Sequence, residues 1–299
     1  MTLLEQLTQK TLVGDGAMGS QLQNAGLEPG GCGEAWNIEY PDRVLAIQRG
    51  YVAAGSDCLT TNTFGGCRVM LERHALGHEV AAINRAAVEI AREAFGDRPG
   101  FVIGDIGPFG GLMEPYGEVP EADVRDAFGE QARALVDAGA DAIIIETQTA
   151  FEELKLGIDA AREAGATCVI GSMAYDVGQD ESQIFTMMGI HPQMAAEFLS
   201  ENGADIVALN CGTGMDMQYA EHAVRVYRET CNLPLMAQPN AGLPELIKMK
   251  VHYGESPEQM AAGVPGLLAA GANIVGACCG STADHIRLIR ATVDQHAET

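Results

Sequence analysis

The stretch Ala270-Gly271-Ala272-Asn273-Ile274-Val275-Gly276-Ala277-Cys278-Cys279-Gly280 contains two patterns that predict the fold and its chemistry. They are a short glycine motif, Ala270–Asn273, and a pair of cysteines at the end of an apolar run. The first pattern recurs between helix-like stretches and apolar runs, as Ala54-Gly55-Ser56-Asp57, Ala138-Gly139-Ala140-Asp141, Ala164-Gly165-Ala166-Thr167 and Asn202-Gly203-Ala204-Asp205. A glycine directly after a helix adopts the left-handed conformation at little cost. Each copy therefore predicts the end of a helix, followed at once by a buried parallel strand.

Eight apolar runs of strand length follow one another along the chain: Leu12–Asp15, Cys58–Phe64, Phe101–Ile106, Ala142–Glu146, Cys168–Ala174, Ile206–Asn210, Leu233–Gln238 and Ile274–Ala277. Segments with apolar residues three or four apart separate them, which is the helical period. Strands that alternate with helices in this way predict an α/β fold, a (β/α)8 TIM barrel that forms a single domain over residues 1–299. An open doubly wound sheet is the alternative, but no Gly-x-Gly-x-x-Gly turn follows the first run.

Polar residues collect where the predicted strands end, which is where active sites lie in a TIM barrel. The ends of the runs read Asp15-Gly16-Ala17-Met18-Gly19, Thr61-Asn62-Thr63-Phe64-Gly65, Gly104-Asp105-Ile106-Gly107-Pro108, Glu146-Thr147, Asn210-Cys211-Gly212, Gln238-Pro239-Asn240-Ala241-Gly242 and Cys278-Cys279-Gly280. We therefore expect Cys211, Cys278 and Cys279 to meet on one rim of the barrel.

Three thiols on one rim suit a Zn²⁺ ion with three protein ligands and one position left for a substrate. Neighbouring side chains of a regular strand point to opposite faces, so Cys278 and Cys279 can act together only where their strand ends. The alternatives are a vicinal disulfide or cysteines that merely fill space, since free cysteine is often a small buried hydrophobe. We assign the space-filling role to Cys32, Cys58, Cys67, Cys168 and Cys231.

A zinc ion with three thiolates carries net negative charge, which suits the activation of a further thiol better than the polarisation of a carbonyl. A thiolate is a soft nucleophile, so the reaction class that follows is the alkylation of a thiol. Asp15 and Glu146 are placed to hold the ammonium group of an amino-acid substrate. Their ordinary roles remain open: Asp15 as the cap of its glycine turn, and Glu146 as a solvated strand end.

The composition narrows the choice of partners. Acidic residues outnumber basic ones by 41 to 18, and the formal net charge of −23 opposes binding to nucleic acid or to anionic membranes. The first ten residues lack the apolar segment of a secretion signal, and no apolar run is as long as a membrane span. We therefore expect a cytoplasmic protein without nucleic-acid or membrane partners.

The motifs at the strand ends, together with Pro239-Asn240-Ala241-Gly242-Leu243-Pro244 and Gly276-Ala277-Cys278-Cys279-Gly280, resemble those of the homocysteine S-methyltransferase family from about Leu12 to Ile289. The resemblance implies one catalytic zinc per chain, held by Cys211, Cys278 and Cys279, and L-homocysteine bound to it through sulfur. It also implies that Asp15 and Glu146 bind the substrate amino group. We add Gly16 and Asn240, from the same motifs, to the predicted substrate site.

The methyl donor differs between branches of this family, and the motif spelling is most similar to the homocysteine-binding module of cobalamin-dependent methionine synthase. Betaine is disfavoured because Gly65 and Thr147 stand where betaine-using enzymes carry tyrosines, and the single tryptophan, Trp36, lies in a different context. The S-methylmethionine branch also spells the second strand differently.

The expected donor is therefore methylcobalamin, carried by a separate corrinoid-binding protein, because the chain ends at Thr299 without room for further modules. Six glycines near strand ends predict an open rim for such a donor: Gly65, Gly66, Gly107, Gly110, Gly111 and Gly212. A free-standing enzyme with betaine, S-methylmethionine or another small donor is the alternative. A zinc-binding or thiol-binding protein without catalytic activity is a more distant one.

Overall fold

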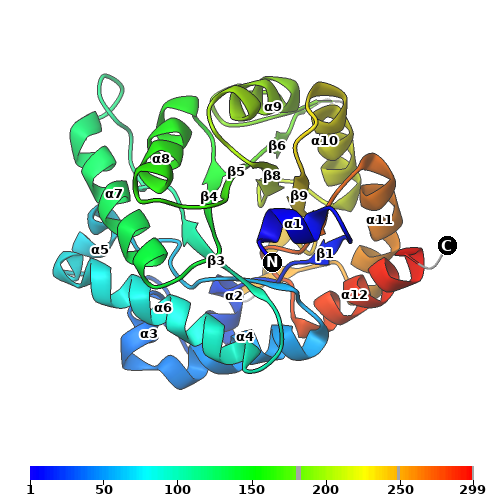
Figure 1. The fold of residues 1–299 in the computed structure, drawn as a ribbon, viewed down its shortest axis with the longest axis horizontal. Coiled ribbons are helices and arrows are strands. Elements are labelled where there is room, and N and C mark those ends of the chain that lie inside the picture. The colour runs from blue at the N-terminus through cyan, green and yellow to red at the C-terminus, as the bar shows by residue number, and fades with distance from the viewer. Residues whose placement is uncertain (180–182, 248–249, 298–299) are drawn as a thin grey trace.

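The computed structural model describes residues 1–179, 183–247 and 250–297, and its centre is a ring of parallel strands surrounded by helices (Figure 1). The strands of the ring are β1 (Leu12–Val13), β2 (Cys58–Thr60), β3 (Phe101–Ile106), β4 (Ala142–Gln148), β5 (Val169–Met173), β8 (Ile206–Asn210), β9 (Leu235–Gln238) and β12 (Ile274–Val275). They pair in the order β1-β12-β9-β8-β5-β4-β3-β2. This is a nearly closed eight-stranded barrel, so the predicted single-domain TIM barrel is confirmed.

All eight predicted runs contain a strand, but several strands stop earlier than predicted. Two match the predicted bounds, Phe101–Ile106 and Ile206–Asn210. The second strand ends at Thr60 rather than Phe64, because the chain turns there: the Thr63 N–H donates to the Thr61 carbonyl and the Gly66 N–H to the Thr63 carbonyl. The polar residues of this motif therefore lie in a turn above the sheet.

Polar side chains complete the barrel between β1 and β2, where the described residues form no continuous ladder. The Asp57 N–H donates to the Val13 carbonyl at 2.7 Å, and the Asp57 carboxylate accepts from the Val13 N–H at 2.9 Å. Two residues after Val13, the Asp15 carboxylate accepts a hydrogen bond from the Thr60 N–H at 2.7 Å. Asp15 thus has a structural bond at the seam as well as a place at the rim.

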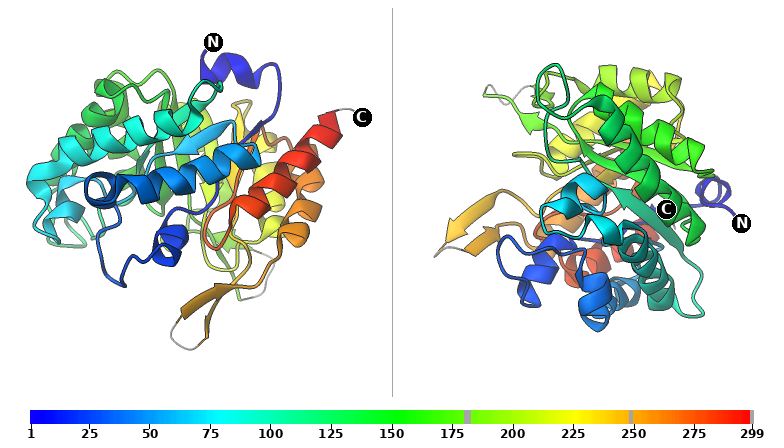
Figure 2. Two further views of the ribbon diagram at one scale, coloured as in Figure 1. Left: turned by 90° about the horizontal axis from the view of Figure 1, so that it is seen from below. Right: turned by 90° about the vertical axis from the view of Figure 1, so that its left-hand side faces the viewer.

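The helices surround the barrel and follow the strands in sequence. They are α1 (Leu3–Leu7), α2 (Gly19–Asn24), α3 (Trp36–Glu39), α4 (Pro41–Ala54), α5 (Arg68–Glu72), α6 (Val80–Phe95), α7 (Glu121–Asp137), α8 (Phe151–Glu163), α9 (Pro192–Glu201), α10 (Met217–Thr230), α11 (Pro257–Ala270) and α12 (Ala283–Ala297), with a short 3₁₀ helix, η1 (Gly77–Glu79). The leucines of α1, Leu3 and Leu7, pack against the apolar side chains inside the barrel. Figure 2 shows α1 at the end of the barrel opposite a projecting hairpin.

Two antiparallel hairpins extend the loops after β5 and β9, and the sequence analysis did not predict them. They are β6 (Asp176–Val177) with β7 (Ile184–Phe185), and β10 (Pro244–Ile247) with β11 (Lys250–Tyr253). The second hairpin projects from the body of the molecule (Figure 2). Both belong to the face of the barrel at which the strands end.

The repeated glycine motif ends a helix in every copy, as predicted. Its glycines, Gly55, Gly139, Gly165, Gly203 and Gly271, all have φ between 90° and 107°. This left-handed conformation is favourable for glycine and costs other residues about 1–2 kcal/mol. The motif therefore sets the point at which each chain segment leaves its helix and enters the barrel.

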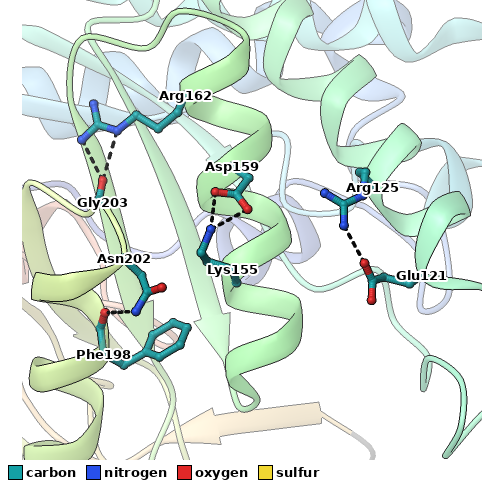
Figure 3. A network of polar contacts seen from close by, with 8 residues as sticks. All are labelled: Glu121, Arg125, Lys155, Asp159, Arg162, Phe198, Asn202 and Gly203. Carbon is teal, nitrogen blue, oxygen red and sulfur yellow. Dashed lines mark hydrogen bonds and ion pairs between the residues drawn. The ribbon is translucent and has the colours of Figure 1, made fainter.

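The last residue of the motif ties neighbouring strands together. The Asp141 carboxylate accepts from the Val102 N–H at 2.7 Å, and the Asp205 carboxylate accepts from the Val169 N–H at 2.8 Å. An arginine supports each carboxylate, and Arg162, the partner of Asp205, also donates to the Gly203 carbonyl (Figure 3). The motif thus joins consecutive strands at the end of the barrel that lies away from the polar rim.

The cysteines outside the predicted triad are buried, with one exception. Cys58 and Cys168 face the interior of the barrel, and Cys67 and Cys231 pack between the barrel and its helices. Cys32 is half buried: it packs against the apolar cluster of Leu71, Val80 and Ile83, and its sulfur lies 3.4 Å from the Glu34 carboxylate. Cys32 lies in the irregular connection between α2 and α3, which leaves its side chain partly exposed.

Charged side chains cover the outer faces of the helices. Glu121 and Arg125 form an ion pair on α7, and Lys155 and Asp159 form another on α8 (Figure 3). Exposed pairs of this kind contribute at most about 1 kcal/mol each. In the described part of the chain, no helix combines the length and the apolar character needed to span a membrane.

Candidate functional site

A cavity of about 430 Å³ opens at the end of the barrel where the strands stop. Its walls come from the last residues of β2, β3, β4 and β9 and from the segments after β1, β2, β8 and β12. Among its lining residues are Asp15, Gly16, Phe64, Asp105, Glu146, Thr147, Cys211, Cys278 and Cys279. The polar rim predicted from the sequence is therefore one continuous cavity.

The three predicted cysteines meet in this cavity. The Cys279 sulfur lies 3.9 Å from the Cys211 sulfur and 3.9 Å from the Cys278 sulfur, and all three sulfurs are within 4.8 Å of one another. Sulfurs bound to a tetrahedral zinc ion at about 2.3 Å stand roughly 3.8 Å apart. The spacing, and the soft character of the ligands, fit Zn²⁺.

The backbone of the two cysteine turns is shaped to bring the sulfurs together. Strand β12 ends at Val275, so Cys278 and Cys279 both belong to the turn that follows it. Cys211 has φ of 55° and Gly212 has φ of 87°, two left-handed residues in succession. A left-handed cysteine costs about 1–2 kcal/mol, and such local strain is characteristic of functional sites.

Asn240 forms hydrogen bonds with both cysteine turns. Its side-chain carbonyl accepts from the Cys279 N–H at 3.1 Å, and its amide group donates to the Gly212 carbonyl at 3.0 Å. Asn240 is buried, and the lining of the cavity does not include it. This position supports a role in holding the cysteines, while direct binding of substrate by Asn240 stays a prediction.

Because of hydrogen bonds among the three thiols, Cys279 is the first of them to lose its proton. Bonds with Cys211 and Cys278 lower the pKa of Cys279 to about 3. Bonds with Cys211 and Cys279 raise the pKa of Cys278 well above its usual value. A cation that binds all three sulfurs must therefore displace the remaining thiol protons, so its affinity will increase with pH.

Three carboxyl groups face the same cavity: Asp15 and Asp105 are buried, and Glu146 is half buried. Burial raises the pKa of Asp15 to about 7, although the bond from the Thr60 N–H acts against it. Burial also raises the pKa of Glu146 to about 7, and a hydrogen bond with Asp105 partly offsets this rise. No lysine or arginine is among the described residues that line the cavity. The site is acidic and lacks its own counter-charge, which favours a cationic ligand group.

Asp105, at the end of β3, belongs to this group, and the predicted site residues did not include it. Burial and the charge of Glu146 raise the pKa of Asp105 well above its usual value. Asp105 therefore holds the proton of the pair, and Glu146 accepts the hydrogen bond. The sequence contains only a partial signal: a carboxyl group near the end of a predicted buried strand needs a partner, but the sequence does not show that the partner is Glu146.

Asn210 fixes the position of Glu146 and Thr147. Its side-chain amide group donates to the Thr147 hydroxyl at 2.7 Å and to the Glu146 carboxylate at 3.2 Å. Its carbonyl oxygen accepts from the Thr147 N–H at 3.0 Å. Thr147 has φ of 57°, so these bonds hold a strained turn. Because Asn210 directly precedes Cys211, it joins the carboxyl group to the cysteine triad.

Gly16 lines the cavity at a point of close packing. A Cβ at this position would lie 2.7 Å from the Ser281 hydroxyl oxygen and 2.8 Å from the Tyr51 ring. The Ser281 hydroxyl in turn accepts from the Ala17 N–H at 2.9 Å and donates to the Cys278 carbonyl at 2.8 Å. Glycine is therefore required for the packing, and contact between Gly16 and substrate stays a prediction.

The six glycines expected to form an open rim do not do so, and that interpretation is wrong. A Cβ at any of them would lie within 3 Å of a neighbouring group: the Glu34 carboxylate at Gly65, the Asn84 amide at Gly66, Phe64 at Gly107, Met70 at Gly110, Phe109 at Gly111, and the Tyr175 carbonyl at Gly212. These glycines allow close packing of the loops. Larger apolar side chains are exposed on the segments that follow the strands: Phe64, Leu112, Tyr116, Met187, Met188 and Leu243.

The raised pKa of Asp15 predicts a stability effect that depends on pH. The folded protein keeps a proton on Asp15 up to about pH 7, whereas the unfolded chain loses it near the ordinary pKa of 3.8. Asp15 therefore lowers the stability progressively as the pH rises from about 4 to about 7, and by a constant amount above that. Asp15→Asn has the same shape and can still accept from the Thr60 N–H. We expect it to gain stability relative to the wild type between pH 5 and pH 8.

Urea unfolding of Asp15→Asn and of the wild type at pH 5 and at pH 8, with a metal chelator present, measures the difference in their free energies of unfolding. Asp137→Asn, at the exposed end of α7, is the matched control. If the difference between Asp15→Asn and the wild type is the same at both pH values, Asp15 is not held protonated by the fold.

Comparisons with known proteins find similar sequences over nearly the whole chain. The sequence model described as "Homocysteine S-methyltransferase" matches residues 12–293. The methionine synthases of Mycobacterium leprae (strain TN) and Mycobacterium tuberculosis (strain ATCC 25618 / H37Rv) are each 34% identical over 305 residues, or 97% of this chain and 25% of the relative. The chain thus spans about a quarter of the length of these relatives.

A solved structure is also similar in fold. The metallated form of the homocysteine methyltransferase MmuM from Escherichia coli superimposes with a TM-score of 0.77, covering 95% of this chain and 96% of that chain. The two sequences are 21% identical. At this level the likeness supports the barrel architecture and nothing more specific.

Proposed function

The chain belongs to the homocysteine S-methyltransferase family, and from this membership we propose that it forms L-methionine by transferring a methyl group to the thiol of L-homocysteine. The observation that carries the proposal is the triad of free thiols, whose sulfurs all lie within 4.8 Å of one another and face an acidic cavity. A space-filling role does not explain three converging sulfurs with strained backbone. The proposed cofactor is one Zn²⁺ per chain, with Cys211, Cys278 and Cys279 as its ligands.

The donor set supports zinc over harder metals. Thiolates favour zinc strongly, whereas magnesium and calcium take oxygen ligands. When bound by three thiolates, zinc has a position free for a substrate sulfur and keeps that sulfur deprotonated near neutral pH. The protein's part is to fix the three sulfurs, which the Asn240 and Ser281 hydrogen bonds do.

The carboxyl cluster is proposed to orient the substrate. Asp15 and Glu146 face the cavity, and the described lining contains no lysine or arginine, with His74 as its one histidine. The ammonium group of homocysteine would supply the missing charge and draw both groups toward the ionised form. Asn210 holds Glu146 next to Cys211, so the amino group and the sulfur of one small amino acid can be bound at the same time.

The proposed methyl donor is methylcobalamin, carried by a corrinoid-binding protein, with this barrel as the homocysteine-activating part of a split methionine synthase. The similarity to methionine synthases supports this choice. Phe64 is the one aromatic residue among the described residues that line the cavity, whereas a cage for a quaternary ammonium needs several rings. Trp36 is not available, because Arg43 lies over its ring at 4.9 Å.

Exposed apolar side chains on the connecting segments also favour a protein-borne donor. Leu112, Tyr116, Met187, Met188 and Leu243 all lie on segments that follow strands, at the end of the barrel where the cavity opens. Exposed apolar side chains on the face that carries a functional site can form part of a surface that another protein covers.

Binding of homocysteine is expected to release close to one proton per site near pH 7.5 when the protein is loaded with zinc. The reason is that the substrate binds as a thiolate. Calorimetric titration in two buffers with different ionisation enthalpies counts the proton. The chelated protein, as control, should bind weakly and release none. Equal binding with no proton release in both forms would contradict the proposed function.

A further inference from the structure

Gln238, the last residue of β9, points into the barrel. Met236, two residues earlier, packs among the apolar side chains of the interior, and side chains two residues apart along a strand lie on the same face. Gln238 lines the cavity from the layer above Met236, with 5% of its surface exposed. Gly276 leaves room for it, since a Cβ at Gly276 would lie 3.3 Å from the Gln238 Cγ. The wall of the cavity therefore contains a nearly buried amide group.

This amide group has no hydrogen-bond partner in the part of the chain that the structure describes. The Gln238 side-chain carbonyl is buried and unpaired, and its NH₂ group donates to no described residue. Other buried glutamines with an unpaired carbonyl donate their NH₂ groups to backbone carbonyls and lie outside the cavity lining: Gln48, Gln131 and Gln148. The Ser20 hydroxyl oxygen and one Asp105 carboxyl oxygen, both in the lining, are unpaired as well. Unpaired buried polar groups destabilise a fold, so their gathering in one cavity indicates a ligand that supplies the missing bonds.

The place of β9 in the ring sets the surroundings of this amide group. Strand β9 pairs with β8 on one side and with β12 on the other, and the cysteines follow these two strands. The Cys211 N–H donates to the backbone carbonyl of Gln238 at 3.4 Å. In the strand order β9 stands four strands from β3, so Gln238 lies across the barrel from Asp105, with Glu146 on the neighbouring strand β4. The amide group is therefore next to the triad and opposite the carboxyl groups.

The carboxylate of an amino-acid substrate needs hydrogen-bond donors, and the described lining offers few. It has no lysine or arginine. The hydroxyl groups of Thr60, Thr61 and Thr63 already form hydrogen bonds within the protein. The lining side chains with a donor to spare are otherwise exposed or only half buried: Ser20, Gln23, His74 and Thr147. Gln238 is thus the buried side chain that can donate to a ligand deep in the cavity.

We propose that Gln238 is a specificity-determining residue whose NH₂ group donates to the carboxylate of the substrate, so that the site selects an α-amino-acid thiol over thiols without a carboxylate. The inference rests on the proposed function, because it takes the substrate sulfur to lie at the triad and the ammonium group at Asp15 and Glu146. A zwitterion then fits the two sides of the cavity. The acidic side attracts the ammonium group, and the neutral amide group receives the carboxylate away from the negative charges.

Two thiols that differ only in the carboxylate test this inference: L-homocysteine and 3-aminopropane-1-thiol. Calorimetric titration of zinc-loaded protein gives the affinity for each. Gln238→Met keeps the length of the side chain and removes the amide group. We expect it to weaken the binding of L-homocysteine roughly ten- to hundredfold, the equivalent of one hydrogen bond to a charged group. The binding of 3-aminopropane-1-thiol, which has no carboxylate to lose, should weaken by less than about threefold.

Stability and zinc content separate recognition of substrate from a structural role. Because the Gln238 amide group has no partner in the described chain, Gln238→Met should unfold at the same urea concentration as the wild type or at a higher one. Its zinc content should equal that of the wild type. Gln218→Met, at an exposed glutamine on α10, is the matched control and should leave the affinities for both thiols unchanged.

Three results would overturn the inference. They are an unchanged affinity of Gln238→Met for L-homocysteine, an equal loss of affinity for both thiols, and a lower stability or zinc content of the variant, which would make Gln238 a structural residue. Any of them, when the wild type binds and methylates homocysteine, overturns this inference alone. If the wild type binds neither thiol, the proposed function fails and the inference fails with it.

Discussion

Replacement of Cys211, Cys278 or Cys279 by alanine is expected to lower methyl transfer to homocysteine to below about one thousandth of the wild-type rate, because activation of the thiol by a metal contributes several kcal/mol. The same variants should hold far less than one zinc per chain after dialysis. The three sulfurs lie within 4.8 Å of one another, so removal of one leaves two ligands and no defined tetrahedral site.

The fold should survive these replacements. The triad lies in the turns after β8 and β12, above the apolar interior of the barrel, so the variants should keep the circular dichroism spectrum of the wild type. Cys58→Ala and Cys168→Ala are the matched controls, because both side chains are buried inside the barrel. Each should lose about 1 kcal/mol of stability and keep both zinc and activity. Full zinc content in the triple variant of Cys211, Cys278 and Cys279 would contradict the assignment.

Methylcobalamin, free or bound to a corrinoid protein, is expected to methylate homocysteine at least roughly thirtyfold faster than betaine or S-methylmethionine. A desolvated cation over aromatic rings gains about 2 kcal/mol or more, a factor of about thirty, and this cavity has only Phe64 among its described lining residues. An assay with the four donors at equal concentration measures the ratio. Rapid turnover with betaine and none with methylcobalamin would refute the split-synthase proposal.

A second comparison within this assay tests whether the donor arrives on a protein. Leu112 is exposed in the loop after β3 and lies outside the lining of the cavity. Leu112→Asp should therefore raise the KM for a methylated corrinoid protein and leave the rate with free methylcobalamin unchanged. Leu112→Ala is the milder companion variant. An equal effect on both donors would place Leu112 in the fold or the cavity rather than on a docking surface.

The barrel could be predicted because its signals are local. The left-handed glycine of each repeat depends only on its own turn, and all five copies behaved alike. Even the convergence of Cys211 with Cys278 and Cys279 follows from one rule, that parallel strands of a barrel end at one rim.

Other parts of the site depend on contacts between distant segments. Asp105 was missed because its importance comes from burial beside Glu146, which the sequence does not show. The prediction of an open rim from six glycines was wrong because a glycine indicates that another group packs closely against it, but does not show which group. Gly212, for example, makes room for the Tyr175 carbonyl rather than for a ligand.

We propose above all that the cysteine triad holds a zinc ion that takes up the sulfur of homocysteine. X-ray absorption at the zinc edge, recorded on zinc-loaded protein with and without saturating L-homocysteine, tests this proposal most directly. Three sulfur neighbours at about 2.3 Å are expected without substrate and four with it. Three sulfur neighbours in both samples, with homocysteine bound, would contradict it.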